Sequence, residues 1–411
     1  MHEMVMKTRS TPDMPLFDKR TRYDPAPMHR GESSFQFLNR VDTPYWQRVR
    51  DLLQAWLQHY PPGARADLTQ RLRSDADSQH LPAFWELYLH EALRRDGWQV
   101  TVHPALQSTS IRPDFLATRG PEALFMEATA IVKPVLSERQ SKHFQQVLKG
   151  VDDLRTPDFS LGVNYISVGS RAPSTRRLRR DLAVWLGGLD CEGLARDLRA
   201  GDGHQVLPTY SWTPTPDWHL IFHAFPLKKG ASSRPEFRPV GMTGPGFATS
   251  VDHRGPLKGR LLEKLQRLKE IPHSLVIAVL DLSEYPFYSH ECDSALYGQT
   301  VGVHNPMTLQ EVSAYREKDG FWSIGGRRAA LVSGVLVCSG LRPWTICGRE
   351  GATPVLWLNG ARESRAPRLP WPTSALGPDG LSVLSTLPEQ EMFELFGVAP
   401  EWPGPGPAYP D

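Results

Sequence analysis

The alternation of apolar and polar positions predicts helices and strands that follow one another along most of the chain. Residues 43–60 and 81–97 carry apolar side chains at the i, i+3, i+4 spacing of an amphipathic helix, and the second pattern ends at Gly97. Strand patterns occur at 98–104, 111–131, 159–169, 217–227, 274–282, 328–340 and 354–360. The run 274–282 is apolar along nearly its whole length, which is typical of a central strand buried on both faces. Because a helical pattern precedes this strand, we expect an α/β fold.

The two ends of the chain differ in composition from its middle. Residues 1–35 are polar with scattered prolines, which predicts a mobile N-terminal tail, and residues 399–411 are rich in proline and glycine, which predicts a disordered C-terminal tail. Helices predicted at 43–60 and 64–74 should cover one face of the sheet. A last helix is predicted at 383–397.

Two carboxylates face each other in a strand hairpin predicted within 111–131. If its polar loop runs from 119 to 122, residues whose numbers sum to 241 lie opposite each other, which pairs Asp114 with Glu127. Opposite side chains have Cβ atoms roughly 4.5–5.5 Å apart, and two like charges there oppose folding unless a cation lies between them. A divalent metal is the expected cation, because hard cations bind carboxylate oxygens. A register changed by one residue would instead send the two side chains to opposite faces, where each would be an ordinary strand residue.

A third carboxylate, Glu86, lies in the helix that precedes the hairpin. It stands beside the buried stripe of that helix, so it could point along the sheet toward the hairpin. The alternative is that Glu86, in the first turn of its helix, only interacts favourably with the helix dipole.

The order helix, glycine, strand, then Pro113-Asp114, then a strand bearing Glu127-Ala128-Thr129 resembles the PD-(D/E)xK nuclease superfamily, which includes restriction endonucleases and Holliday-junction resolvases. The resemblance covers about residues 81–170. It implies a restriction-endonuclease-like α-β-β-β-α-β core that ends with the helix at 137–154 and the strand at 159–169. Residues 36–170 would then form a helical lead-in plus this core, and 171–398 a C-terminal α/β extension with basic helices. The resemblance also implies that Glu86, Asp114 and Glu127 hold Mg²⁺ or Mn²⁺ for phosphodiester hydrolysis.

The chain departs from the family at Thr129, where the family usually has lysine. Residues 127 and 129 share one face of a strand, so Thr129 points where that lysine would point. A hydroxyl can bond the attacking water, but it supplies no positive charge. Lys133, just past the strand, or Lys142, in the next helix, could reach back as migrated lysines do in this superfamily. Otherwise the site is degenerate, and the chain is a nucleic-acid-binding subunit of a larger complex that does not cut.

Clustered basic residues are candidates for contact with a phosphate backbone. The net charge is only +2, which permits a nucleic-acid partner without requiring one. The densest cluster contains Arg176, Arg177, Arg179 and Arg180, and a second basic helix near 257–270 carries Lys258, Arg260, Lys264, Arg267 and Lys269. Each phosphate that these residues neutralise would add salt-dependent affinity. The alternative is that both are solvated helix faces with local ion pairs.

The four cysteines, which have no C-x-x-C spacing, indicate free thiols rather than a zinc site. No apolar run is long enough to cross a membrane, and the first residues lack the apolar segment of a signal peptide, so a cytoplasmic protein is expected. The resulting hypothesis is a Mg²⁺-dependent endonuclease that acts on DNA in restriction, antiviral defence or repair, as a possible homodimer or part of a larger defence complex. The alternatives are the non-cutting subunit and a protein with no nucleic-acid role.

Overall fold

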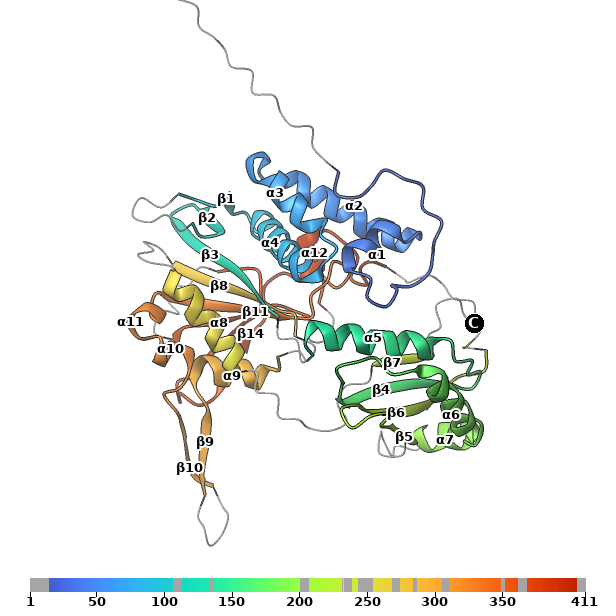
Figure 1. Ribbon diagram of the computed structural model, residues 1–411. Helices are drawn as coiled ribbons and strands as arrows, with labels where there is room; N and C mark the ends of the chain where they lie inside the picture. The colour runs from blue at the N-terminus through green and yellow to red at the C-terminus, as the bar shows by residue number, and fades with distance from the viewer. Residues whose placement is uncertain are drawn as a thin grey trace, which may run out of the picture.

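A computed structural model describes most of the chain, and it is drawn as a ribbon in Figure 1. The described residues are 15–105, 112–132, 136–199, 207–230, 232, 239–242, 254–267, 274–283, 287–304, 311–348, 352–360 and 368–404. Their helices and strands belong to a mixed α/β fold, as the hydrophobic pattern predicts.

One large mixed sheet organises most of these residues. Its strand order is β1-β2-β3-β8-β11-β12-β13-β14. The strands are β1 Gln99–Val102, β2 Phe115–Arg119, β3 Glu122–Ile131, β8 Ser274–Asp281, β11 Val332–Ser339, β12 Val355–Leu358, β13 Thr373–Leu376 and β14 Val383–Thr386. Strand β8 runs parallel to both of its neighbours, β3 and β11, and seven of its eight residues are buried. The prediction of a central strand at 274–282 is therefore confirmed.

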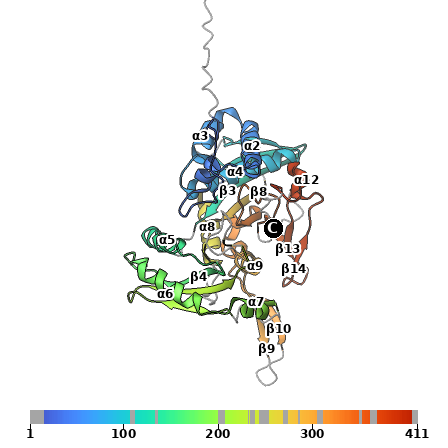
Figure 2. The same ribbon diagram turned by 90° about the vertical axis from the view of Figure 1, so that its right-hand side faces the viewer.

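Helices cover both faces of this sheet (Figures 1 and 2). The N-terminal helices and the short last helix share one core with the even-numbered side chains of β3, such as Met126, whereas α8 and α9 share another core with odd-numbered ones, such as Phe125. The first group is α1 Ser34–Arg40, α2 Pro44–His59, α3 Pro62–Leu72, α4 Asp77–Arg95 and α12 Met392–Phe396. The second is α8 Arg254–Arg267, α9 Ser289–Tyr297, α10 Phe321–Ile324 and the neighbouring α11 Gly326–Ala329.

Helix α4 ends as its sequence predicts and leads directly into β1. Gly97 has φ +83°, a conformation that costs glycine nothing, and the Trp98 N–H donates to the carbonyl oxygen of Leu93 at 3.0 Å. The buried Trp85 of the same helix donates from Nε1 to the carbonyl oxygen of Ala278 in β8 at 3.1 Å. The helix is therefore fixed against the centre of the sheet.

A second, four-stranded sheet lies apart from the first (Figure 1). Its order is β5-β6-β4-β7, and its apolar face packs against α5, α6 and α7 in a separate core. The elements are α5 Glu138–Asp152, β4 Phe159–Ser167, α6 Thr175–Gly187, α7 Cys191–Arg199, β5 Thr209–Trp212, β6 His219–Pro226 and β7 Val240–Met242. Arg30 links this unit to the N-terminal helices, since its Nε and Nη2 bond Asp152 at 2.5 and 2.8 Å.

The expectation that 137–154 and 159–169 continue the first sheet is wrong. Both elements form as predicted, but β4 pairs with β6 and β7, not with any strand of the large sheet. The helix and strand that follow β3 in space are α8 and β8, because β8 pairs with β3 in parallel. The boundary expected at residue 170 is wrong for the same reason: residues 138–242 are an insertion between β3 and α8.

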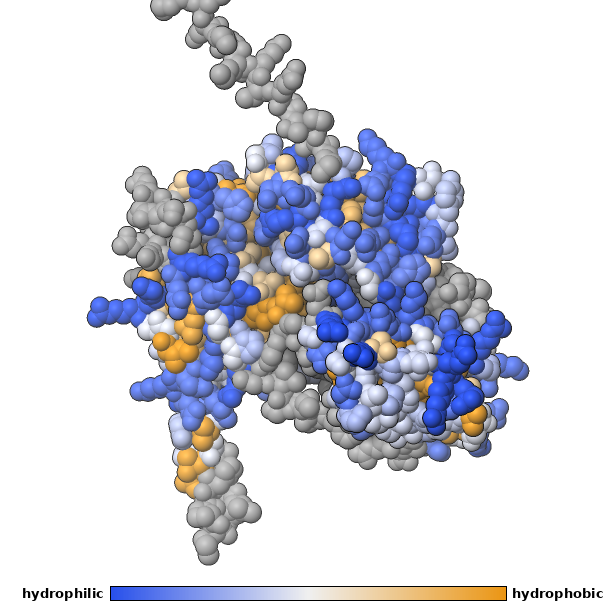
Figure 3. Space-filling model, in the orientation of Figure 1, coloured by the Kyte–Doolittle hydropathy of each residue, from blue (hydrophilic) through white to orange (hydrophobic). Residues whose placement is uncertain are grey.

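Strands β9 Thr300–His304 and β10 Glu311–Arg316 form an antiparallel ribbon that projects from the body of the molecule (Figure 1). Val303, Val312 and Tyr315 are exposed on it. Figure 3 shows hydrophobic, orange surface on this ribbon. The sequence patterns did not predict this ribbon.

Three expectations about the ends of the chain need correction. Residues 15–35 are not a mobile tail, since Leu16 and Phe17 are buried in the core shared with the N-terminal helices, while 1–14 lie outside the described residues. The segment 399–404 is placed against the body: Trp402 packs on the same core and donates to the carbonyl oxygen of Pro343, and 405–411 are outside the described residues. The helix predicted at 383–397 forms only at its end, because its first residues build β14.

Candidate active site

The β2–β3 hairpin has the register that brings Asp114 and Glu127 together. Its ladder pairs Phe115 with Met126 and Arg119 with Glu122, so paired residue numbers sum to 241, as predicted. Asp114 directly precedes β2, and its Oδ2 accepts the backbone N–H of Ala128 at 2.7 Å. That bond holds the Asp114 carboxylate against the residue that follows Glu127. The two carboxylates therefore lie side by side at the point where the hairpin strands open.

A lysine from a distant part of the chain completes this pair. Lys264 of α8 donates from Nζ to Glu127 Oε1 at 2.6 Å, and both side chains are largely buried. Leu257, Leu261 and Leu265 are the buried stripe of α8, which packs on the face of β3 that carries odd-numbered residues. Since Lys264 lies one turn from Leu261 and beside Leu265, the same packing that buries the leucines aims the lysine at Glu127.

With both carboxyl groups ionised, the pair carries more negative charge than its surroundings compensate. Within the described residues, Glu127 Oε2 is buried and has no hydrogen-bond partner. Burial, followed by the nearby Glu127 and Glu86 carboxylates, raises the pKa of Asp114 to about 8, although the Ala128 N–H and Lys264 act in the opposite direction. A buried carboxylate with one oxygen that no donor reaches, beside a partly buried one, forms a site that a cation would stabilise.

Glu86 approaches Asp114 from the other side of the sheet, because it belongs to α4. Both of its oxygens bond Arg71 of α3, at 2.6 and 2.7 Å. Tyr60, the residue that caps α2, lies close enough for the Glu86 and Asp114 carboxylates to add to the effect of burial, which raises the Tyr60 pKa. Its buried hydroxyl has no hydrogen-bond partner among the described residues. Glu86 therefore borders the site but, in this structure, is paired with an arginine.

The candidate replacements for the missing motif lysine have different positions. Thr129 is buried on the same face of β3 as Glu127, as expected, and it carries no charge. Lys133 lies outside the described residues. Lys142 is exposed on α5, a helix whose buried residues belong to the core of the inserted unit. The lysine that forms an ion pair with Glu127 in the described structure is Lys264.

The site has the donor chemistry for a divalent metal at Asp114 and Glu127. The uncompensated Glu127 oxygen and the raised Asp114 pKa are the effects expected of carboxylates that would bind a hard cation. Within the part of the chain that the structure describes, no group of three or more His, Cys, Asp and Glu side chains is arranged to hold a metal ion. The fit therefore rests on two carboxylates, and Glu86 would join them only by leaving Arg71.

The basic residues proposed for nucleic-acid contact fall into two groups. On α6, Arg176, Arg177 and Arg180 are exposed, but Arg177 and Arg180 both pair with Asp181, at 3.4 and 3.7 Å, and Arg179 pairs with Asp153 at 2.9 Å. On α8, Lys258 pairs with Asp319 and Arg260 with Glu263. Both groups therefore form the local ion pairs of the alternative interpretation, and they differ in that three of the α6 arginines are exposed.

Three residues at the site were not identified from the sequence as part of it: Lys264, Arg71 and Tyr60. Lys264 was noted only as one member of a basic helix. Its position beside the leucine stripe of that helix is a signal that it faces the sheet rather than solvent. No comparable local signal marks Arg71 or Tyr60, since both reach the site through the packing of α2 and α3 on α4.

Comparison with protein-family models, with curated proteins and with solved structures finds no match for this chain. Among the described residues, no helix combines the length and the apolar character needed to span a lipid bilayer.

Proposed function

We propose that this protein is a metal-dependent nuclease of the PD-(D/E)xK type that hydrolyses phosphodiester bonds in DNA. The observation that carries the proposal is the 2.6 Å ion pair between Lys264 and Glu127, beside Asp114. This arrangement supplies the acidic pair and the ammonium group of the family motif, with the lysine provided by α8 instead of position 129.

The order of elements around the site supports the same assignment. Once the inserted 138–242 segment is set aside, the chain runs α4, β1, β2, β3, α8, β8, which is the α-β-β-β-α-β order that the resemblance implies. Strand β8 lies beside β3 and in parallel with it, so α8 is the crossover helix and Lys264 reaches the site from it. The inserted unit then adds a basic surface to this core rather than forming part of it.

Each residue has a chemical role in the proposed reaction. Asp114 and Glu127 would hold Mg²⁺ or Mn²⁺, which lowers the pKa of water and stabilises negative charge on the phosphate when it is bound. Lys264 places a cation next to Glu127, where it can orient the attacking water and balance charge that develops on the phosphate. Thr129 can accept or donate one hydrogen bond to that water.

A second candidate function is a nucleic-acid-binding subunit that does not cut. Its specific support is the bidentate pair between Arg71 and Glu86, which leaves two carboxylates for a metal instead of three. In that case the α6 arginines would bind DNA and the Asp114–Glu127 pair would have no catalytic role. Cytoplasmic localisation, a defence or repair role and assembly as a homodimer or larger complex remain proposals of the same kind.

The test is a cleavage assay on supercoiled plasmid and on linear DNA with Mg²⁺, with Mn²⁺ and with a chelator. We expect cleavage with either metal, none with the chelator, and a loss of at least about 100-fold in Asp114→Ala. Glu122→Ala is the matched control, because Glu122 lies in the same hairpin and pairs with Arg119 at 3.3 Å, away from the site. DNA binding without cleavage in any of these conditions would support the non-cutting subunit instead.

A further inference from the structure

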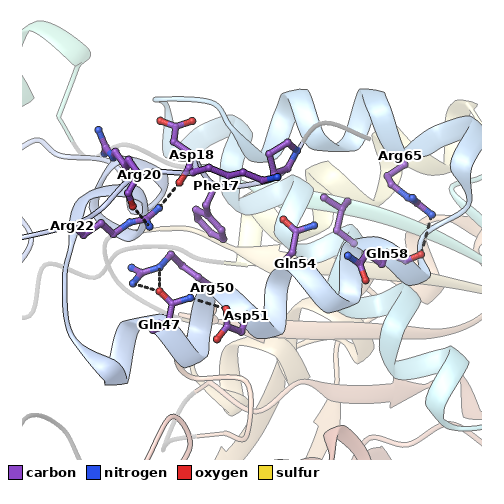
Figure 4. Close-up of a pocket in the computed structure, with 13 residues that line it drawn as sticks. Phe17, Asp18, Arg20, Arg22, Gln47, Arg50, Asp51, Gln54, Gln58 and Arg65 are labelled. Atoms are coloured by element: carbon purple, nitrogen blue, oxygen red, sulfur yellow. Dashed lines mark hydrogen bonds between the residues drawn. The ribbon is translucent and has the colours of Figure 1, made fainter. Parts of the chain in front are cut away.

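A basic cavity lies on the N-terminal part of the molecule, between the extended segment that starts at residue 15 and helix α2. Its volume is about 480 Å³, within the range of small-molecule sites. Figure 4 shows Arg20, Arg22 and Arg50 together at one end of the cavity and Arg65 at the other. Nothing in the proposed nuclease chemistry uses this cavity.

The three clustered arginines are held by neutral acceptors. Arg50 donates from Nη1 to the carbonyl oxygens of Leu38 and Val41, both at 2.8 Å, and the Nε of Arg22 and the Nη2 of Arg20 each bond the carbonyl oxygen of Asn39 at 2.9 Å. Within the described residues, none of the three arginines forms an ion pair with a carboxylate. Their positive charges are therefore gathered by hydrogen bonds that do not neutralise them.

Nearby acidic residues do not remove this excess charge. Asp18 is bonded by Arg73 at 2.7 Å and by Asn39 at 2.9 Å, so it offsets the charge of Arg22 only in part, as Asp42 also does. Exposed Asp51 accepts a hydrogen bond from Gln47 at 2.7 Å. Burial is the main cause that lowers the pKa of Arg50 to about 10, and the charge of the neighbouring Arg22 adds to it. Exposed Lys19, which also lines the cavity, adds a further positive charge.

These arginines have one structural role, since they bond carbonyl oxygens at the C-terminal end of α1. That role does not account for Arg20, whose side chain donates a single hydrogen bond among the described residues, while a guanidinium group has five N–H donors. It also does not account for an open cavity in front of the cluster. The remaining wall contains Phe17, Leu57 and the side-chain amide of Gln54. Such a wall suits a ligand that carries an organic group as well as a negative charge.

We propose that this cavity binds a phosphate monoester, carried either by a free mononucleotide or by the 5′ end of a DNA strand. A monoester carries about −1.5 to −2 charges at neutral pH, whereas a phosphodiester carries one, so the monoester better balances a cluster of three arginines and a lysine. The planar guanidinium groups match phosphate oxygens in geometry as well as in charge. The site is separate from the Asp114–Glu127 pair, so binding requires neither a metal nor cleavage.

Calorimetric titration of the full chain, with a chelator present, tests this proposal. The first arm compares AMP with adenosine, and the second compares a 5′-phosphorylated oligonucleotide with the same strand ending in a 5′-hydroxyl. Binding of AMP but not adenosine identifies a nucleotide site, and preference for the 5′-phosphorylated strand identifies a DNA-end site. If neither phosphorylated probe binds more tightly than its unphosphorylated partner, the proposal is wrong.

Variants locate the binding in the cavity. Lys19→Gln combined with Arg20→Gln should weaken binding of the phosphorylated probe at least tenfold, because both side chains are exposed and neither is needed to hold the core. Arg48→Gln is the matched control: Arg48 is an exposed arginine of α2 that bonds the carbonyl oxygen of Pro403 outside the cavity. Equal affinities for the double variant, the control and the unmodified chain would overturn the proposal. Thermal unfolding without ligand checks that the variants are folded.

Discussion

The chemistry of the site depends on individual side chains whose environments oppose their charge. Glu127 is buried beside the partly buried Asp114, and the ammonium group of Lys264 pairs directly with only one of the four carboxylate oxygens. Asp114 and Glu127 could be predicted from the sequence because a hairpin with a short Gly120-Pro121 turn fixes which residues face each other. Lys264 could not be assigned, because 137 residues separate it from Glu127 and local patterns carry no information on that contact.

Asp114 should make the metal-free protein less stable as the pH rises. Its folded-state pKa of about 8 lies above the unfolded value of about 3.9, so the folded state binds the extra proton and stability falls between these two values. Asp114→Asn removes this effect. One pKa unit corresponds to about 1.4 kcal/mol of unfolding free energy. If only a quarter of the difference between the folded and unfolded pKa values is realised, Asp114→Asn should be about 1.4 kcal/mol more stable than the unmodified protein at pH 8 and about equally stable at pH 4.

Urea unfolding with a chelator, at several pH values between 4 and 8, measures this difference. Asp75→Asn, at an exposed position before α4, is the control and should follow the unmodified protein at every pH. A constant gap between Asp114→Asn and the unmodified protein across this range would contradict the assigned environment of Asp114.

At the scale of elements, the site is made where α8 packs on β3. The spacing of Leu257, Leu261 and Leu265 predicts a helix, but it does not predict which strand that helix covers. Residues 137–154 and 159–169 show the same helix-then-strand pattern as 254–267 and 274–281, so the sequence offered two candidates for the core crossover. Strand pairing decides between them, and it depends on contacts over more than 100 residues that amphipathic patterns do not encode.

Leu261→Ala should disturb both the stability and the chemistry. Leu261 is fully buried, so its truncation should cost about 2–5 kcal/mol, and the shift of α8 into the vacated space should displace Lys264 and slow cleavage. Leu262→Ala makes the same change one residue along, at a partly buried position, and should cost clearly less. Denaturant unfolding and cleavage rates below the melting transition provide the measurements. Equal effects of the two variants would mean that α8 does not pack as described.

At the scale of the molecule, a core with a buried site carries an inserted unit with its own sheet, its own apolar core and an exposed basic helix. Net charge gave little indication of this division, because a total of +2 does not show where along the chain the basic residues gather, as they do on α6. The α/β class and most strands followed from local pattern, since burial imposes its period on each segment separately. The insertion could not be predicted from local pattern, because it depends on which distant segments pair in space.

Replacing Arg176, Arg177 and Arg180 with glutamine should weaken DNA binding in a salt-dependent way. If each contacts one phosphate, the slope of log affinity against log salt should fall by about 2 to 3. Lys228→Gln with Lys229→Gln is the control, because both lysines are exposed on the same unit outside α6. Fluorescence anisotropy at several salt concentrations measures the slopes. An unchanged slope in the triple variant would place the DNA elsewhere on the molecule.

The central claim is that Lys264 replaces the lysine that the family motif would have at position 129. The most direct measurement is the single-turnover cleavage rate of Lys264→Met with and without Thr129→Lys, in Mg²⁺ and with a saturating concentration of protein. Lys264→Met should lose at least about 100-fold, and Thr129→Lys should restore a substantial part of that rate by returning the ammonium group to the same face of β3. A Lys264→Met variant that cleaves as fast as the unmodified protein would contradict the claim.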